Sequence, residues 1–89
     1  MAQSDLLRLK GSIEDVARKA AGMASTLGVL RKELDAAAAR AQGQVQGTAQ
    51  QQRYAAMIAA YQQAAVACDS AVDALVKAGR AGTDIGKSL

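Results

Sequence analysis

Apolar residues recur along the first half of the chain by alternating steps of three and four residues. This spacing places them on one side of an α-helix and is the a/d pattern of helices that pack in bundles. It predicts a first helix over about residues 4–42. The positions of this predicted seam are Leu6, Leu9, Ile13, Val16, Ala20, Met23, Leu27, Leu30, Leu34, Ala37 and Ala41. Further apolar residues widen the stripe on one side, namely Leu7, Ala17, Ala24 and Ala38. A widened stripe suits a helix bundle better than a two-stranded coiled coil.

The second half of the chain repeats the pattern. Thr48 followed by Gln51 reads as a capping box, so a second helix is expected over about residues 49–79. Gly79 and Gly82 are expected to end it, which leaves residues 80–89 as a flexible polar tail. The seam of this helix comprises Tyr54, Ile58, Tyr61, Ala65, Cys68, Val72, Leu75 and Gly79.

The connection between the predicted helices is short and polar, a bend at residues 43–48. Two helices joined so closely must lie antiparallel, so we expect an all-α chain with a single helical hairpin domain over residues 1–89. Much of the apolar content is alanine, which buries little area, and a lone hairpin leaves one edge of each stripe uncovered. Chains of this size usually need a disulfide, a metal or a partner. We therefore expect the hairpin to dimerise into a four-helix bundle.

The residue content argues against a disulfide within the chain, a metal site and catalysis. The chain has no histidine and a single cysteine, Cys68, which excludes an intrachain disulfide and a zinc site of the Cys/His kind. We expect no catalytic residue, no metal and no cofactor, hence a protein that is not an enzyme. Cys68 lies on the seam, where a small buried apolar role is expected.

Charge and hydropathy limit the kinds of partner that the chain is expected to bind. The net charge is +3, but acidic and basic residues are mixed, so no nucleic-acid surface is expected. No apolar run approaches the ~20 residues of a membrane span, and the N-terminus lacks the apolar segment of a secretory signal peptide.

The bend carries a more specific pattern. In Val45-Gln46-Gly47, an apolar residue precedes a glycine by two positions, and Ala49, Tyr54 and Tyr61 follow. The layout resembles the WXG or Esx family of type VII secretion substrates, which are helical hairpins with Trp-X-Gly at the bend, then a small residue and two aromatics. Val45 stands where that family has tryptophan. Here it is expected to tuck between the helix ends like a hydrophobic staple, while Gly47 permits the turn.

The resemblance implies a function. Esx-like proteins pair with themselves or with a sister hairpin and pass from the bacterial cytoplasm to the outside through a type VII secretion ATPase, without a Sec signal peptide. The family's Tyr-X-X-X-Asp tail signal is absent, because Arg80 stands four residues before Asp84. The chain then resembles the subunit of a heterodimer that lacks the tail signal and whose other subunit carries it. From the seam spacing, the residues expected in the core or at the interface are Leu27, Leu30, Leu34, Tyr54, Ile58, Tyr61, Val72 and Leu75.

Two questions stay open at this stage. The chain is such a pairing protein, a chaperone-like adaptor that binds the N-terminal helical domain of a larger secreted toxin, or a cytosolic coiled-coil regulator unrelated to secretion. The pairing itself is either homodimeric or heterodimeric. Charges beside the first seam are mostly basic, which favours an acidic mate. These charged residues are Lys10, Lys19, Arg31, Glu33 and Arg40.

Overall fold

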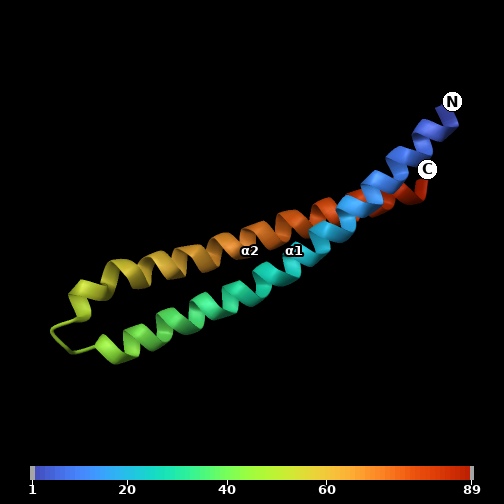
Figure 1. The fold of residues 1–89 in the computed structure, drawn as a ribbon. Helices are drawn as coiled ribbons and strands as arrows, with labels where there is room; N and C mark the ends of the chain where they lie inside the picture. The colour runs from blue at the N-terminus through green and yellow to red at the C-terminus, as the bar shows by residue number, and fades with distance from the viewer. Residues whose placement is uncertain (1, 89) are drawn as a thin grey trace. The chain divides into compact units, whose positions relative to one another are not determined.

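Two long helices make up the computed structural model, which describes the backbone of residues 2–88 and the side chains from Ser4 to Ser88. Helix α1 runs from Ala2 to Val45 and helix α2 from Gln51 to Ser88, with residues 46–50 between them (Figure 1). Within residues 2–88 there is no strand. The all-α prediction is therefore confirmed, with helices longer than the sequence pattern suggested.

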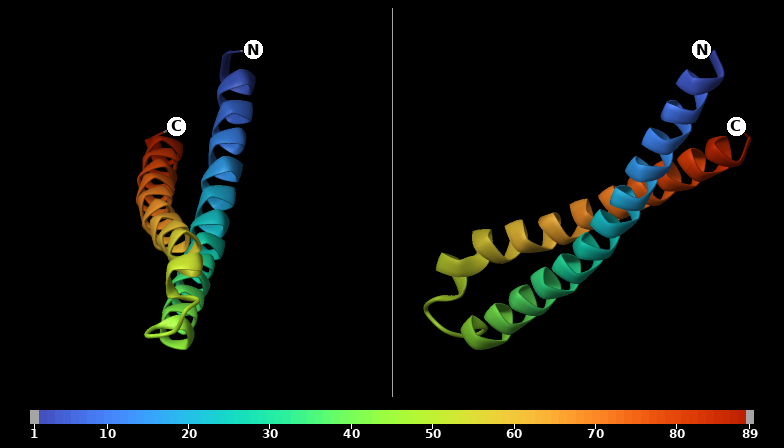
Figure 2. Two further views of the ribbon diagram at one scale, coloured as in Figure 1. Left: turned by 90° about the vertical axis from the view of Figure 1, so that its left-hand side faces the viewer. Right: turned by 45° about the vertical axis from the view of Figure 1, so that its right-hand side comes forward.

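The helices pack in two compact units. The terminal unit combines α1 up to Thr26 with α2 from Ala71, and the bend unit comprises Leu27 to Ser70. In each unit the α1 and α2 segments run antiparallel, as expected for helices joined by a short connection (Figures 1 and 2). The sequence predicts one hairpin domain, and its residues pack as two compact units, each built from both helices.

Small side chains dominate the buried positions. The buried apolar residues are Ala20, Ala24, Ala38, Ile58, Ala65 and Cys68. Ala38 is 2% exposed, and no large side chain among those described is fully buried. Cys68 is buried as a free thiol, as its seam position predicts. Alanine contributes little buried area, so each unit is held by close helix contact rather than by a thick hydrophobic core.

The face that α1 turns toward α2 differs from the predicted seam at several positions. In the terminal unit Ala20 and Ala24 are buried, whereas the predicted seam residues Val16 and Met23 are exposed. In the bend unit, too, an alanine is buried while a large seam residue is exposed, namely Ala38 and Leu30. The predicted stripe had two flanks, one of large side chains and one mainly of alanine. The helices pack through the alanine flank because small side chains let two backbones approach closely.

The predicted helix stop at Gly79 and the predicted flexible tail are wrong for residues 80–88, which are helical. Residue 89 lies outside the described residues. Gly82 faces α1, where an added Cβ would lie 3.4 Å from Ile13 Cγ2 and 3.5 Å from Ala17 Cβ. The three-and-four spacing of the seam continues through Gly82 to the buried Gly86. Contact with α1 therefore offsets the low helix propensity of glycine, and α2 continues.

Replacing Gly82 with leucine tests this close approach. Gly82→Leu forces a side chain into the space held by Ile13 and Ala17, so we expect a loss of about 1–3 kcal/mol in the free energy of unfolding. The matched control is Thr83→Leu, which adds the same side chain at the neighbouring exposed position. Urea unfolding at fixed protein concentration measures both. Equal stability of the two variants would contradict the close packing of α2 on α1.

Candidate functional site: bend and apolar face

Helix α1 ends at Val45, and the bend begins at the next residue, Gln46. Gly47 has a φ of +76°, the left-handed conformation that commonly follows a helix C-terminus and that glycine adopts without strain. No atom lies within 4 Å of a Cβ built on Gly47, so its backbone conformation rather than lack of space favours glycine there. Val45 and Gly47, the predicted bend residues, thus lie on either side of the helix end.

Side chains of the bend cap both helix ends. The Thr48 hydroxyl donates to the carbonyl of Val45 at 2.6 Å and accepts from the Gln50 amide at 3.2 Å. Gln51 Oε1 accepts from the Gly47 amide at 3.0 Å. The predicted pair, Thr48 and Gln51, therefore forms a reciprocal cap, but each accepts from the amide one residue earlier than in a standard capping box. This shift accompanies the start of α2 at Gln51 rather than at residue 49.

Val45 is half-buried and lines a hollow of about 170 Å³ beside the bend. Ile58, the largest of the buried residues, lines the same hollow from α2. Gln42, Gln46, Gln51 and Gln62 supply much of the remaining wall. Val45 thus faces the space between the helix ends, where we expect it to act as a hydrophobic staple. It does not fill this space completely.

One face of the terminal unit is apolar and open. Val16 and Met23 of α1 are 61% and 58% exposed, and Leu9 is half-exposed. Beside them lies a hollow of about 230 Å³, which Ser12, Ile13, Val16, Ala17 and Ala20 line together with Ala78 and Gly82 of α2. Ser12 is the one residue with a polar side chain in this lining. We call this surface, carried by Leu9, Val16 and Met23 with Ala71 and Ala78 of α2, the apolar face.

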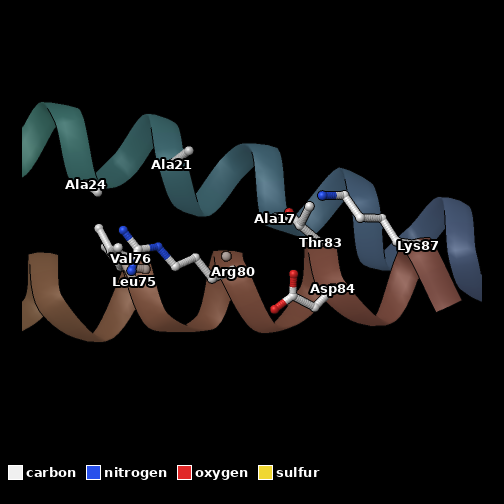
Figure 3. Close-up of a pocket in the computed structure, with 10 residues that line it drawn as sticks. Ala17, Ala21, Ala24, Leu75, Val76, Arg80, Thr83, Asp84 and Lys87 are labelled. Atoms are coloured by element: carbon white, nitrogen blue, oxygen red, sulfur yellow. The ribbon is translucent and has the colours of Figure 1, made fainter.

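The opposite face of the terminal unit has a different chemistry. Its hollow of about 460 Å³ is lined by alanines of α1 and by Val76, Arg80, Thr83, Asp84 and Lys87 of α2. Figure 3 shows the side chains of Arg80 and Lys87 lying back along α2 toward its N-terminal end, as long side chains on helices do. This surface carries charges of both signs and is solvated. The asymmetry singles out the apolar face as the candidate binding surface.

The bend unit holds most of the predicted interface residues. Ile58 is buried, and Leu27 and Leu34 are half-buried between the helices. Leu30, Tyr54 and Tyr61 are exposed, at about two-fifths of their full surface. The remaining two, Val72 and Leu75, are half-buried in the terminal unit. The structure thus buries or half-buries five of these eight residues and leaves three exposed, and their role in binding a partner stays a prediction.

Ion pairs within the chain account for several charges beside the first seam. Lys19 Nζ lies 3.2 Å from Asp15 Oδ2, and Lys10 Nζ lies 4.0 Å from Glu14 Oε1. The hydrogen bond and the positive charge of Lys19 lower the pKa of the Asp15 carboxyl below its usual range, and Arg18 adds to this. These exposed pairs stabilise the helix only slightly.

In the bend unit, Arg31 joins the helices electrostatically. Its Nε lies 3.4 Å from Asp35 Oδ2 on α1 and 3.3 Å from Asp69 Oδ1 on α2, without hydrogen-bond geometry. Because Arg31 and Asp69 lie on different helices, their pairing depends on the register of the two helices.

Within the described residues, no group of three or more Cys, Asp or Glu side chains is placed to hold a metal ion. No helix in that range is long and apolar enough to cross a membrane. Comparison with protein-family models, curated proteins and solved structures finds no match for this chain. The bend and the apolar face are therefore the candidate functional sites of the described residues.

Sequence reasoning missed the division of the α1 stripe into two flanks. The signal was present, because Ala17, Ala24 and Ala38 form one flank while Val16 and Met23 belong to the other. A difference in side-chain size between two flanks of one stripe indicates two packing partners at different distances.

Alanine substitutions at two glycines test the bend. Gly47→Ala should lower the free energy of unfolding by roughly 1–2 kcal/mol, because alanine is strained at positive φ. Gly43→Ala is the matched control. Gly43 lies inside α1 with nothing within 4 Å of an added Cβ, so alanine should raise stability by up to ~1 kcal/mol. Thermal unfolding of both variants at one protein concentration should show a loss of stability for Gly47→Ala and a gain for Gly43→Ala. A gain of stability for Gly47→Ala would exclude the left-handed turn.

Proposed function

We propose that this chain is a helical pairing protein whose apolar face binds a second helical hairpin to form a four-helix bundle. The supporting observation is the exposure of large apolar side chains beside a core made mainly of alanine. Val16 and Met23 are more than half exposed, while the buried residues of the terminal unit are Ala20 and Ala24. Their exposure leaves the hydrophobic free energy of these side chains largely unused until a partner covers them.

Surface area supports the same proposal. The chain exposes 6571 Å², whereas a typical folded monomer of 9.1 kDa exposes about 4,900 Å². The excess of about 1,700 Å² is greater than the ~800 Å² that each partner contributes to a standard protein interface. One hairpin of similar size is large enough to cover it.

The biological role that we propose is pairing in type VII secretion, as an Esx-like protein. The bend supports this role, since Val45 and Gly47 occupy the helix end where the family has Trp-X-Gly, and Tyr54 and Tyr61 follow on α2. The chain acts through contact rather than catalysis. In this role it pairs in the bacterial cytoplasm and leaves with its mate, or assists the mate's export, by way of the secretion ATPase.

Glutamate substitutions on the two faces of α1 test the pairing. Met23→Glu places a charge on the apolar face and should convert a dimer to a monomer at micromolar concentration, because an unpaired buried charge is strongly unfavourable. The matched control is Ala21→Glu, which lies on the opposite face and should leave the mass unchanged. Sedimentation equilibrium measures the mass. A folded wild-type monomer, with helical circular dichroism, would refute the proposal.

An export assay tests the biological role. In its native host, the tagged chain should reach the culture medium and should disappear from it when the type VII secretion ATPase is inactivated. Met23→Glu should be retained in the cells, while Ala21→Glu should be exported like the wild type. Retention of the wild type together with co-purification of the helical domain of a larger toxin would instead identify a chaperone-like adaptor.

A further inference from the structure

Glycine is unevenly distributed between the two units. The helices of the bend unit contain Gly28 and Gly43, whereas those of the terminal unit contain Gly11, Gly22, Gly79, Gly82 and Gly86. Glycine is the poorest helix former apart from proline, because it loses the most backbone freedom when it becomes helical. The helical segments of the terminal unit are therefore less able to stay helical by themselves than those of the bend unit.

The α2 segment of the terminal unit depends on α1. A Cβ added to any of its three glycines would lie between 3.2 and 3.6 Å from the nearest atom of α1. This close packing offsets the low helix propensity of the segment, as described above for Gly82. If the contact is lost, the reason for α2 to remain helical past Gly79 is lost with it. The α1 and α2 segments of this unit should therefore open together.

The bend unit has contacts that the terminal unit lacks. Ile58 and Cys68, the two buried residues larger than alanine, both belong to the bend unit, whereas the described residues buried in the terminal unit are alanine and glycine. The ion pair between the helices, Arg31 Nε with Asp69 Oδ1 at 3.3 Å, also lies in the bend unit. In the described part of the terminal unit, every ion pair joins residues of α1 alone.

The connection between the helices decides which unit opens first. In the bend unit the two helices are joined directly by residues 46–50, so only a short loop must be closed. A closed terminal unit beside an open bend unit would instead close a loop that comprises all of residues 27–70. The entropic cost of loop closure rises with loop length, so the closed bend unit is the state from which the terminal unit forms.

We propose that the terminal unit opens cooperatively while the bend unit stays folded. In the open form the α1 and α2 segments of the terminal unit separate and lose helical structure, whereas Val45, Gly47 and the caps of the bend keep their contacts. Residues of both helices line the hollow of the apolar face, so opening takes this face apart. The apolar face is thus a surface that the chain can switch off, and the bend is not. The opening needs no partner, so it is independent of the proposed function.

Native-state hydrogen exchange, read at single amides of the full chain by NMR, tests this opening. After correction for intrinsic rates, amides of residues 13–24 and 72–82 should exchange at least about tenfold faster than those of residues 30–41 and 56–68. Amides within one unit should share one level of protection. Protection that falls gradually toward the chain termini would indicate fraying, and equal protection in both units would indicate a single cooperative hairpin. Either result would overturn the proposal.

Two alanine substitutions separate the units. Gly11→Ala and Gly43→Ala each replace an exposed helical glycine with nothing within 4 Å of an added Cβ, so they raise helix propensity without new contacts. Gly11→Ala should slow exchange by up to about fivefold across the terminal unit, including residues 72–82 on the other helix. Gly43→Ala should slow exchange in the bend unit and leave the terminal unit unchanged. Equal slowing of both units by Gly43→Ala would show that they open together and would contradict the proposal.

Sedimentation equilibrium of the same samples reports pairing separately. A folded monomer whose terminal unit exchanges faster would refute the proposed function and support the opening. A dimer whose two units exchange equally would overturn the opening and leave the pairing intact.

Discussion

Close contact between α1 and α2 through small residues is the constraint on which the rest of the structure depends. The buried positions of the terminal unit are Ala20, Ala24 and Gly86, and Gly82 lets Ile13 approach α2. A helix has a limited circumference. When the alanine flank faces the neighbouring helix, the flank with Val16 and Met23 must point elsewhere. The exposure of large apolar side chains is therefore a direct consequence of how the two helices meet, and it is the observation on which the proposed partner rests.

The bend has a related but separate role. Gly47 ends α1 in a left-handed conformation, and Thr48 and Gln51 satisfy amides and a carbonyl that the helix ends leave free. Val45 fills part of the space between the helix ends without filling all of it. These contacts fix the turn locally. The apolar face depends instead on packing far along the chain, so the two features that suggest an Esx-like role arise from different interactions.

The proposed pairing and the charge distribution are consistent with each other. Lys10, Lys19 and Arg31 each have an acidic neighbour within the chain, so the basic character seen beside the first seam is largely neutralised internally. What remains for a partner on the apolar face of the terminal unit is size and hydrophobicity.

The sequence by itself determined the helices, the turn between them and the burial of Cys68. These features follow from local periodicity and capping chemistry, which a linear pattern records. The tertiary structure decided which flank of the α1 stripe faces α2, that α2 continues past Gly79 and Gly82, and that Arg31 lies beside Asp69. Each of these depends on the spacing and register of two distant segments. That spacing is set by contacts such as Ile13 with Gly82, which no local pattern can specify.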